Sequence, residues 1–514
     1  MILKLERERQ ALQKALDDAK TPLERNKLGQ FSTPIELANE ILQYGLSICT
    51  GNEINFLDPA FGTGTFYSAL LQKENKKKIN KATGFEIDHF YGNPTRNIWA
   101  KNDLDLSIAD FTTISPKPSY NLVICNPPYV RQQHIASSEK ARLQTLSFTR
   151  TGIKLSGLAG LYCHFLLLSH SWMSSNAISG WLIPSEFMDV NYGSALKKYL
   201  LDDVTLLHIH RFDPLEGQFA DALVSSAIVW FKNTPPQKEH SVKFSFGGSL
   251  LNPKVSKQIN SDILREEKKW TRFPNSNVRV NDVSSVLEDF FNIRRGLATG
   301  ANKFFIVSEN WINNRKLPFE LFRPILPGPQ SIKDNIVNSD SKGVPELAER
   351  LFLLDTSYPE EYIKNVYPTL FTYIEEGKVD NIDKGYICSH RSPWYSQEKR
   401  APAPIICTYM GRATDKAQHP FRFILNNTNA TMTNAYLGLY PTARLLSLAA
   451  KQPDLIEKIW ERLSQISIAD MIDEGRVYGG GLHKLEPKEL AKVPMPFVDD
   501  LLSIDAPSLR MAIC

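Results

Sequence analysis

The stretch from Tyr120 to Gln133, YNLVICNPPYVRQQ, joins an apolar strand pattern directly to an amide, two prolines and an aromatic ring. If Asn126 lies at the mouth of a ligand site, its side-chain oxygen can accept a hydrogen bond from an amino group. Pro127 has no N–H, so the carbonyls of Asn126 and Pro127 stay open to both hydrogens of one amine. Pro127 and Pro128 stiffen the backbone, and Tyr129 offers a flat face for a planar base. The alternative is an ordinary turn at a strand end.

A glycine-containing turn earlier in the chain has the form of a nucleotide-binding loop. FLDPAFGTGTF, from Phe56 to Phe66, ends a strand pattern at Asp58 and passes through Ala60, Gly62 and Gly64 before a helix pattern begins. Glycines let the backbone approach a ligand closely, and the first turn of the helix offers unpaired N–H groups. Many α/β proteins use such a turn for steric reasons alone, so the motif gains its weight from its neighbours.

Two further strand patterns end in acids that suit an adenosine-bearing ligand. Glu86 comes 22 residues after Gly64, where nucleotide-binding folds place a carboxylate that accepts the ribose hydroxyls. Asp88 is the alternative acid. Asp110 ends the next strand pattern and is a suitable acceptor for an exocyclic adenine amine. Acids at the carboxyl ends of successive parallel strands line one side of a sheet, where ligands bind in open α/β folds.

The elements that position these residues belong to an alternating pattern from about Ile54 to Trp230. Short apolar runs alternate there with helical patterns, which is the signature of βαβ units and predicts an α/β fold with a mostly parallel sheet. Strands are expected at residues 54–60, 81–88, 106–110, 120–126, 178–184, 204–212 and 225–231.

A polar, proline-bearing segment from Lys232 to Lys243 interrupts this pattern and predicts a domain boundary. We therefore expect an N-terminal helical segment at 1–24, a catalytic domain at 25–235 and a second, α+β domain at 245–514. In the last region the expected elements are strand-like pieces at 302–307, 403–410 and 419–425 and one helical region at 443–467.

Composition indicates a globular protein of two or three domains, since the 514 residues are 42% hydrophobic and 23% charged. No stretch is long and apolar enough to cross a bilayer, and the charged N-terminus is unlike a signal peptide, which indicates a cytoplasmic protein. The six cysteines are scattered, so neither a disulfide framework nor structural zinc is expected. Cys125 is expected in the core, and His134, His208 and His210 are expected to be structural or surface groups.

In combination these residues resemble a family, the S-adenosylmethionine-dependent DNA amino-methyltransferases of the TaqI-like gamma class. The resemblance covers about residues 25–231. LGQFSTP is similar to the N-terminal cofactor segment of the family, DPAFGTG to its cofactor loop and NPPY to its catalytic motif. GQFADALVSSAIVWF resembles the last catalytic motif, in which Phe219 corresponds to a ring against the flipped base. Phe61 departs from the pattern, because cysteine is commoner there.

The resemblance implies a Rossmann-like domain that methylates the N6 amine of a flipped adenine in duplex DNA, followed by a target-recognition domain. S-adenosylmethionine is the implied cofactor, and no metal is needed because its sulfonium is already activated. The implied catalytic residues are Asn126, Pro127, Pro128, Tyr129 and Phe219. The implied cofactor-binding residues are Thr33, Pro34, Asp58, Ala60, Gly62, Gly64, Glu86, Ile87, Asp110, Phe111 and Asn126.

The implied partners are double-stranded DNA and a separate restriction endonuclease, with the protein acting as a monomer in a bacterial or archaeal cytoplasm. Several alternatives stay open. Cytosine presents an equivalent amine, and protein and ribosomal-RNA methyltransferases share the NPPY motif. A non-enzymatic alternative is a DNA-binding specificity subunit whose methyltransferase half has lost its activity. A fused restriction enzyme would need a nuclease or a phosphate loop, and the chain has no G-x-x-x-x-G-K-[ST] sequence.

Three stretches of the C-terminal half place basic residues beside aromatic residues and glycines: NIRRGLATGANKFF, SHRSPWYSQEKR and RVYGGGLHKLEP. Such mixtures suit contact with DNA phosphates, although an ordinary exposed loop accounts for any one of them equally well. The candidate DNA contacts are Arg294, Arg295, Lys303, His390, Arg391, Trp394, Tyr395, Lys399, Arg400, Arg476, His483 and Lys484.

Overall fold

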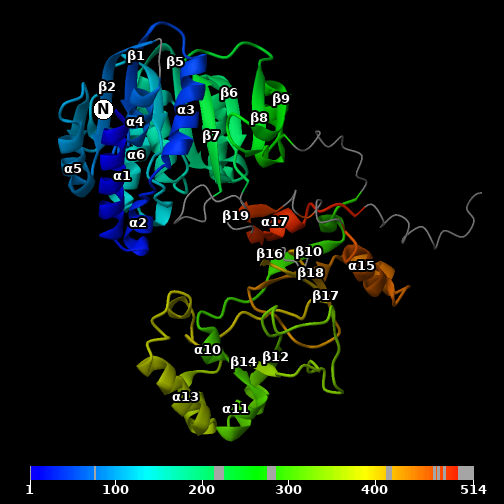
Figure 1. Ribbon diagram of the computed structural model, residues 1–514. Helices are drawn as coiled ribbons and strands as arrows, with labels where there is room; N and C mark the ends of the chain where they lie inside the picture. The colour runs from blue at the N-terminus through cyan, green and yellow to red at the C-terminus, as the bar shows by residue number, and fades with distance from the viewer. Residues whose placement is uncertain are drawn as a thin grey trace, which may run out of the picture. The chain divides into compact units, whose positions relative to one another are not determined.

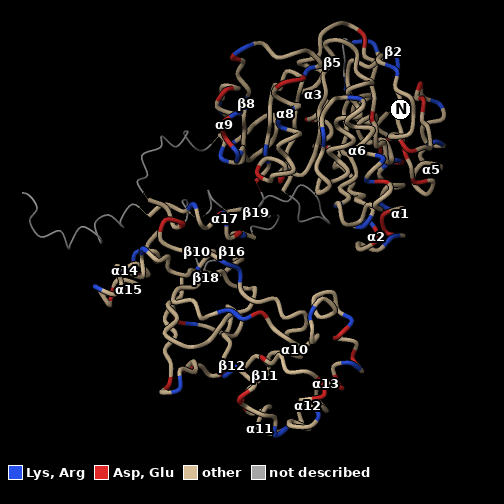
Figure 2. The backbone as a smooth tube through the Cα atoms, turned by 180° about the vertical axis from the view of Figure 1, so that it is seen from behind, with Lys and Arg blue, Asp and Glu red and all other residues tan. Residues whose placement is uncertain are grey.

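The computed structural model describes residues 2–73, 77–213, 225–274, 285–412, 419–466, 471, 475–478 and 482–495. The chain divides into two compact units, the first reaching residue 280 and the second beginning at residue 281 (Figure 1). Lys and Arg are interspersed with Asp and Glu along both units, in keeping with the small net charge of +4 (Figure 2).

The first unit is built on a nine-stranded sheet in the order β3-β2-β1-β4-β5-β7-β6-β8-β9. The first five strands in this order pair in parallel, and β7 runs antiparallel to both of its neighbours, β5 and β6. The predicted mixed, mostly parallel α/β sheet is therefore confirmed. The strands are β1 (Glu53–Asp58), β2 (Lys78–Glu86), β3 (Asp105–Ile108), β4 (Tyr120–Cys125), β5 (Met173–Pro184), β6 (Thr205–Arg211), β7 (Ser226–Lys232), β8 (Ser241–Gly248) and β9 (Pro253–Asn260).

Helices pack on both faces of this sheet, because successive side chains of each central strand point to opposite faces. Phe56 and Leu122 lie in a core with α3 and α4, whereas Leu57 and Val123 lie in a second core with α6, α7 and α8. The helices are α1 (Ile2–Asp18), α2 (Pro22–Leu28), α3 (Ile35–Ile48), α4 (Thr65–Gln72), α5 (His89–Trp99), α6 (Ser137–Thr151), α7 (Leu161–Ser169), α8 (Ser194–Asp202) and α9 (Ser261–Glu266).

The sheet continues past the segment where the sequence suggests a domain boundary. Residues 233–240, within that segment, connect β7 to β8. Strand β8 pairs in parallel with β6 and in antiparallel with β9, so the sheet continues to β9. The residues of β9 are mostly polar and exposed, so this strand has no apolar alternation to reveal it. The N-terminal residues also belong to the first unit, since α1 packs against α4 and α5.

The described residues of the second unit have an α+β organisation with three small sheets in the orders β10-β18-β15-β17-β13, β11-β14-β12 and β16-β20-β19. The strands are β10 (Phe291–Arg295), β11 (Ile306–Ser308), β12 (Phe322–Ile325), β13 (Ile336–Val337), β14 (Leu351–Leu354), β15 (Ile405–Thr408), β16 (Met410–Arg412), β17 (Phe423–Asn426), β18 (Tyr436–Pro441), β19 (Arg476–Tyr478) and β20 (Leu482–Lys484). The helices are α10 (Asn302–Phe305), α11 (Glu309–Asn314), α12 (Glu360–Val366), α13 (Pro368–Val379), α14 (Ala443–Ala449), α15 (Leu455–Leu463) and α17 (Pro487–Leu490).

Two expected elements of this unit differ from the structure. The strand expected at 302–307 begins as the helical turn α10, because the Thr299 hydroxyl and Asn302 form a local hydrogen bond that favours a turn. The helix expected at 443–467 is split into α14 and α15 around Pro453, which cannot continue a helix.

Every helix in the described ranges is too short or too polar to pass through a lipid bilayer.

Candidate active site

Four polar residues of the first unit meet at one edge of the sheet. Asp58 is the last residue of β1 and Glu86 the last residue of β2, while Asn126 follows β4 directly and Asp110 follows β3 by two residues. The strands β3, β2, β1 and β4 are adjacent and parallel, so their carboxyl ends lie side by side. This is the edge at which open α/β sheets bind ligands.

The amide of Asn126 is held by its nitrogen, while its oxygen has no hydrogen-bond donor among the described residues. Its Nδ2 donates to the backbone carbonyl of Phe31 at 2.9 Å and to Thr33 Oγ1 at 3.1 Å. A carbonyl can only accept, so the contact with Phe31 fixes which end of the amide is nitrogen. Asn126 Oδ1 is buried and has no hydrogen-bond partner among the described residues. An orphaned buried acceptor costs about 1–3 kcal/mol, which a donor from a ligand would recover.

Tyr129 is anchored at both its backbone and its hydroxyl. The ring is buried, the hydroxyl donates to the carbonyl of Leu182 at 3.0 Å, and the backbone N–H donates to the carbonyl of Gly29 at 3.2 Å. The Phe31 ring lies 5.6 Å from the Tyr129 ring, with a 40° angle between the ring planes. The NPPY and LGQFSTP motifs, far apart in sequence, therefore form one structure.

Gly29 makes this close approach possible, and its replacement by alanine is expected to be destabilising. A Cβ at Gly29 would lie 2.4 Å from the Tyr129 backbone nitrogen, and its φ of +65° is itself unfavourable for alanine. We expect Gly29→Ala to lower the free energy of unfolding by about 2–4 kcal/mol and to reduce activity. Gly51→Ala is the matched control, since its φ is +87° but a Cβ there meets nothing within 4 Å. Equal urea midpoints for the two variants would contradict this account.

The two glycines of the loop after β1 have different roles. Both have positive φ, 56° at Gly62 and 87° at Gly64. A Cβ at Gly64 would lie 2.6 Å from the Phe61 ring, so this glycine is required for packing. A Cβ at Gly62 meets nothing within 4 Å, and its N–H donates to Glu86 Oε2 at 2.9 Å. Open space therefore lies beside Gly62, next to the Glu86 carboxylate.

Asp58 and Glu86 are carboxyl groups whose pKa values are raised by their surroundings. Asp58 is 1% exposed, and burial together with the neighbouring charge of Glu86 raises its pKa to about 8, although its carboxylate accepts from the Ala60 N–H at 3.1 Å. Burial also raises the pKa of Glu86, whose Oε1 accepts from the Asp88 N–H at 2.8 Å. Raised pKa values of this kind are typical of functional sites.

The contacts of Asp88 favour Glu86 over Asp88 as the ligand-binding acid. Asp88 Oδ1 caps α5 by accepting from the Phe90 N–H at 2.9 Å, while Oδ2 binds Lys20 at 2.6 Å and Gln30 at 3.0 Å. Burial acts to raise the pKa of Asp88, but these hydrogen bonds hold it below its usual value. Both oxygens of the Asp88 carboxylate thus already accept hydrogen bonds from within the protein.

One carboxylate oxygen of Asp110 accepts hydrogen bonds from Thr112, and the other lies beside an arginine. Oδ1 accepts from the N–H and the hydroxyl of Thr112, both at 2.8 Å. Oδ2 lies 3.5 Å from Arg142 Nη2, and Arg142 is also paired with Glu139. The contact of Arg142 could not be predicted from sequence, because nothing in its local sequence links α6 to a residue 32 positions earlier.

The remaining predicted residues fall at different depths. Ile87 is 66% exposed at the edge where the strands end, so its apolar side chain can cover a ligand ring. Thr33 is buried against Asn126, Pro34 precedes α3, and Ala60 follows Asp58 in the loop. Phe111 lies in the core, with its ring against those of Phe85, Phe165 and Trp172, which leaves only its backbone for a ligand. Phe219 lies outside the described residues.

Cys125 and the two histidines of β6 lie in the interior. Burial raises the pKa of the Cys125 thiol well above its ordinary value, which is unfavourable for a nucleophile. His208 Nε2 and His210 Nδ1 both contact Ser245 Oγ, at 2.7 and 2.8 Å. Burial lowers their pKa values to about 3 and about 4, so both rings are neutral.

Two family models match the chain, one on each unit. Residues 35–217 match "Eco57I restriction-modification methylase", and residues 272–512 match "Type II methyltransferase M.Eco57I, C-terminal domain". Among curated proteins, Type II methyltransferase M.XamI of Xanthomonas campestris pv. amaranthicola is 28% identical over 92% of this chain and 86% of its own length. Type II methyltransferase M.AccI of Acinetobacter calcoaceticus is 27% identical over 91% of this chain and 85% of its own length.

The fold also has a solved counterpart. The structure of the Type IIL restriction-modification enzyme MmeI in complex with DNA matches 96% of this chain and 66% of its own chain, with a TM-score of 0.54 and 15% identity. This likeness bears on the fold alone. The two family models and the curated relatives define the class, a type II methyltransferase of restriction-modification systems. Within that class, both family models that match this chain are of the Eco57I type.

Proposed function

We propose that this protein transfers a methyl group from S-adenosylmethionine to the N6 amine of an adenine in duplex DNA. The observation that carries the proposal is the orientation of Asn126, whose Nδ2 is bound by Phe31 and Thr33 while its Oδ1 is buried without a partner among the described residues. An exocyclic amine of a base has the donor that Oδ1 lacks. The NPPY motif and the order of the motifs favour adenine as the base and the gamma class as the subfamily.

The residues beside Gly62 fit S-adenosylmethionine. Glu86 would accept the ribose hydroxyls, Ile87 would cover the adenine ring, and the second oxygen of Asp110 would face the adenine amine. Asp58, Ala60 and the Gly62–Gly64 loop would contact the amino acid part, and Thr33 and Pro34 would close the site from the side of Asn126. When bound, this cofactor supplies a methyl group activated by a sulfonium.

The chain's own part in catalysis is to hold an amine in one orientation. Asn126 Oδ1 and the Pro127 carbonyl accept the two amine hydrogens, which concentrates the nitrogen lone pair on the side of the methyl donor. Pro127 and Pro128 keep these acceptors fixed before the base arrives. Removing the base from the duplex costs roughly a few kcal/mol. Stacking on Tyr129 and Phe219, at about 1–3 kcal/mol per base, would offset that cost.

The test is a side-by-side transfer assay. Purified protein and tritiated S-adenosylmethionine are incubated with duplex DNA, RNA and protein, and the modified nucleosides are separated by mass spectrometry. The proposal expects label in DNA as N6-methyladenine. N4-methylcytosine would correct the base, and label in RNA or protein alone would replace the substrate. No transfer to any of the three would favour a DNA-binding specificity subunit.

We further propose that the enzyme acts as a monomer alongside a separate endonuclease.

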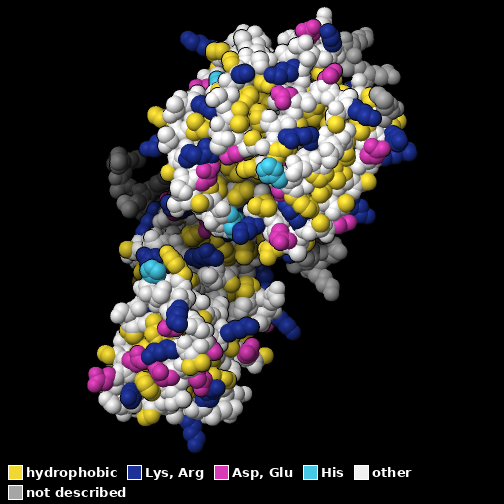
Figure 3. Space-filling model, turned by 90° about the vertical axis from the view of Figure 1, so that its left-hand side faces the viewer, with side chains coloured by type: hydrophobic (Ala, Val, Ile, Leu, Met, Phe, Trp, Pro, Cys, Tyr) yellow, Lys and Arg dark blue, Asp and Glu magenta, His cyan; other side chains and the backbone are white. Residues whose placement is uncertain are grey.

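For DNA recognition we propose the second unit, in which some of the candidate DNA contacts are engaged within the protein and others are exposed. Arg391 is committed to structure, because it donates to the carbonyls of Ala298 and Thr299 at 2.8 and 2.9 Å. Trp394 and Tyr395 pack in a hydrophobic core. The exposed candidates are Arg294, Arg295, Lys303, His390 and Lys399. On the face drawn in Figure 3, Lys and Arg are scattered among acidic and hydrophobic side chains, so individual contacts have to be tested.

Arg294 and Lys303 are expected to contact DNA phosphates. Each single change to alanine should weaken DNA binding uniformly across sequences and should reduce the slope of log K against log salt by about 1. Lys451→Ala, an exposed lysine of the same unit, removes the same charge and serves as the control. Fluorescence anisotropy over a salt series measures the slopes. Unchanged slopes for Arg294→Ala and Lys303→Ala would exclude these two residues.

A further inference from the structure

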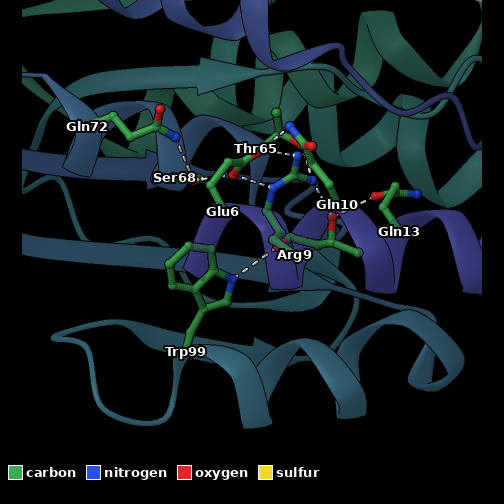
Figure 4. Close-up of polar contacts among 9 residues, drawn as sticks. Glu6, Arg9, Gln10, Gln13, Thr65, Ser68, Gln72 and Trp99 are labelled. Carbon is green, nitrogen blue, oxygen red and sulfur yellow. Dashed lines mark hydrogen bonds and ion pairs between the residues drawn. The ribbon is translucent and has the colours of Figure 1, made fainter. Parts of the chain in front are cut away.

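Helix α1 carries a buried ion pair that the proposed chemistry does not use. Glu6 and Arg9 are 5% and 3% exposed. Arg9 Nε donates to Glu6 Oε2 at 2.8 Å, and Arg9 Nη2 donates to Glu6 Oε1 at 2.7 Å. This two-pronged pairing holds the guanidinium plane in a single orientation (Figure 4).

The third nitrogen of this guanidinium binds the cofactor loop. Arg9 Nη1 donates to Thr63 Oγ1 and to Thr65 Oγ1, both at 2.9 Å. The two threonines lie on either side of Gly64, and Ser68, one turn further along α4, donates to Glu6. The ion pair of α1 thus holds the loop and the first turn of α4 together (Figure 4).

The loop is bound on its other polar groups as well. The Thr63 hydroxyl donates to Gln13 Oε1 at 2.6 Å, and the Thr63 carbonyl accepts from Trp99 Nε1 at 3.0 Å. The Gly62 carbonyl accepts from Thr95 Oγ1 at 3.2 Å. Together with the contact between the Gly62 N–H and Glu86, these bonds fix the backbone on each side of the open space beside Gly62.

Stability alone is a weak reason for such a network. A buried ion pair is often no more stabilising than apolar residues of the same volume, because removing both charges from water is costly. A glycine loop, in contrast, binds a ligand more tightly when other residues hold it in place. Gly62 and Gly64 have many conformations available, and the entropy lost in ordering them would otherwise reduce the free energy of ligand binding.

We infer that α1 is part of the cofactor site, with Arg9, Glu6 and Gln13 acting as positioning residues that hold residues 62–65 in the conformation that binds S-adenosylmethionine. This inference rests on the proposed function. Glu6 neutralises Arg9, so the effect is one of geometry and not of charge. Arg9→Lys keeps the positive charge but loses the planar fork, and Gln13→Ala removes one acceptor from Thr63 near the surface.

The test measures binding of S-adenosylhomocysteine by isothermal titration calorimetry, with the full chain well below its unfolding temperature. We expect Arg9→Lys to raise Kd by about tenfold or more and Gln13→Ala to raise it by about threefold, as expected for lost hydrogen bonds to a charged and a neutral group. In turnover, the KM for the methyl donor should rise while the KM for DNA stays unchanged. A purely structural role would lower the unfolding midpoint without this split.

Glu8→Gln is the matched control, because Glu8 lies on the exposed side of the same helix, 3.9 Å from Lys4. It should bind with the wild-type Kd. If Arg9→Lys does not fold, the Kd of Gln13→Ala for S-adenosylhomocysteine tests the inference. Wild-type Kd values in the folded variants would overturn the role of α1 and leave the proposed function standing. A wild-type protein that binds no S-adenosylhomocysteine and methylates no DNA would overturn the proposed function and this inference with it.

Discussion

Replacing Asn126 by alanine is expected to abolish methyl transfer while leaving the fold intact. The change removes the buried Oδ1 acceptor, and the loss of one preorganised polar group that acts on the transition state typically costs about 10²–10³ in kcat. The backbone should stay in place, because Pro127, Pro128 and the Tyr129 to Gly29 hydrogen bond hold it independently. Single-turnover methyl transfer to DNA and the urea midpoint of unfolding are the two measurements.

Asn126→Asp separates the two halves of the amide. It keeps acceptor oxygens but loses the donors to Phe31 and Thr33, and one carboxylate oxygen would then face the Phe31 carbonyl without a hydrogen between them. We expect activity to fall here too, because orientation matters as much as the presence of an oxygen. Near wild-type transfer by Asn126→Ala would show that the amide does not act on the substrate.

The edge of the sheet where the site forms could be predicted from sequence because it depends on local patterns. Each apolar run ends at an identifiable residue, and parallel pairing brings those ends together whatever the details of packing. This reasoning places Asp58, Glu86 and Asn126 at one edge of the sheet, where the structure has them. The partners of Asn126 could not be predicted in this way, since Phe31 lies 95 residues earlier and its contribution is a backbone carbonyl, which any residue type provides.

The residues that were missed depend on long-range contacts between polar side chains. In the sequence, Glu6 and Arg9 are ordinary charges on an amphipathic helix, and nothing local shows that both become buried. For Arg391 the sequence suggested a function that the structure does not support. Its type and neighbours suggested DNA contact, but its donors bind carbonyls nearly a hundred residues away. Residue type shows what a side chain can do, and only the fold shows whether that capacity is already used.

Glu86 and Asp88, at the end of β2, give the second large prediction, because they are two residues apart and have different roles. Glu86→Gln is expected to raise the Kd for S-adenosylhomocysteine by about ten- to a hundredfold, since a neutral amide replaces a charged acceptor of the ribose hydroxyls. The amide would also face the N–H groups of Gly62 and Asp88 with one oxygen instead of two. Calorimetric titration of the purified chain measures the change in affinity.

Asp88→Asn provides the contrast. An asparagine at this position would still cap α5, but the neutral side chain loses the ion pair with Lys20, so the unfolding midpoint should fall slightly while cofactor affinity is retained. The pair of variants distinguishes a charge that faces the ligand from one that holds the protein together. If Asp88→Asn lost affinity and Glu86→Gln kept it, the roles of the two acids would be reversed, and the open space beside Gly62 would no longer mark the ribose position.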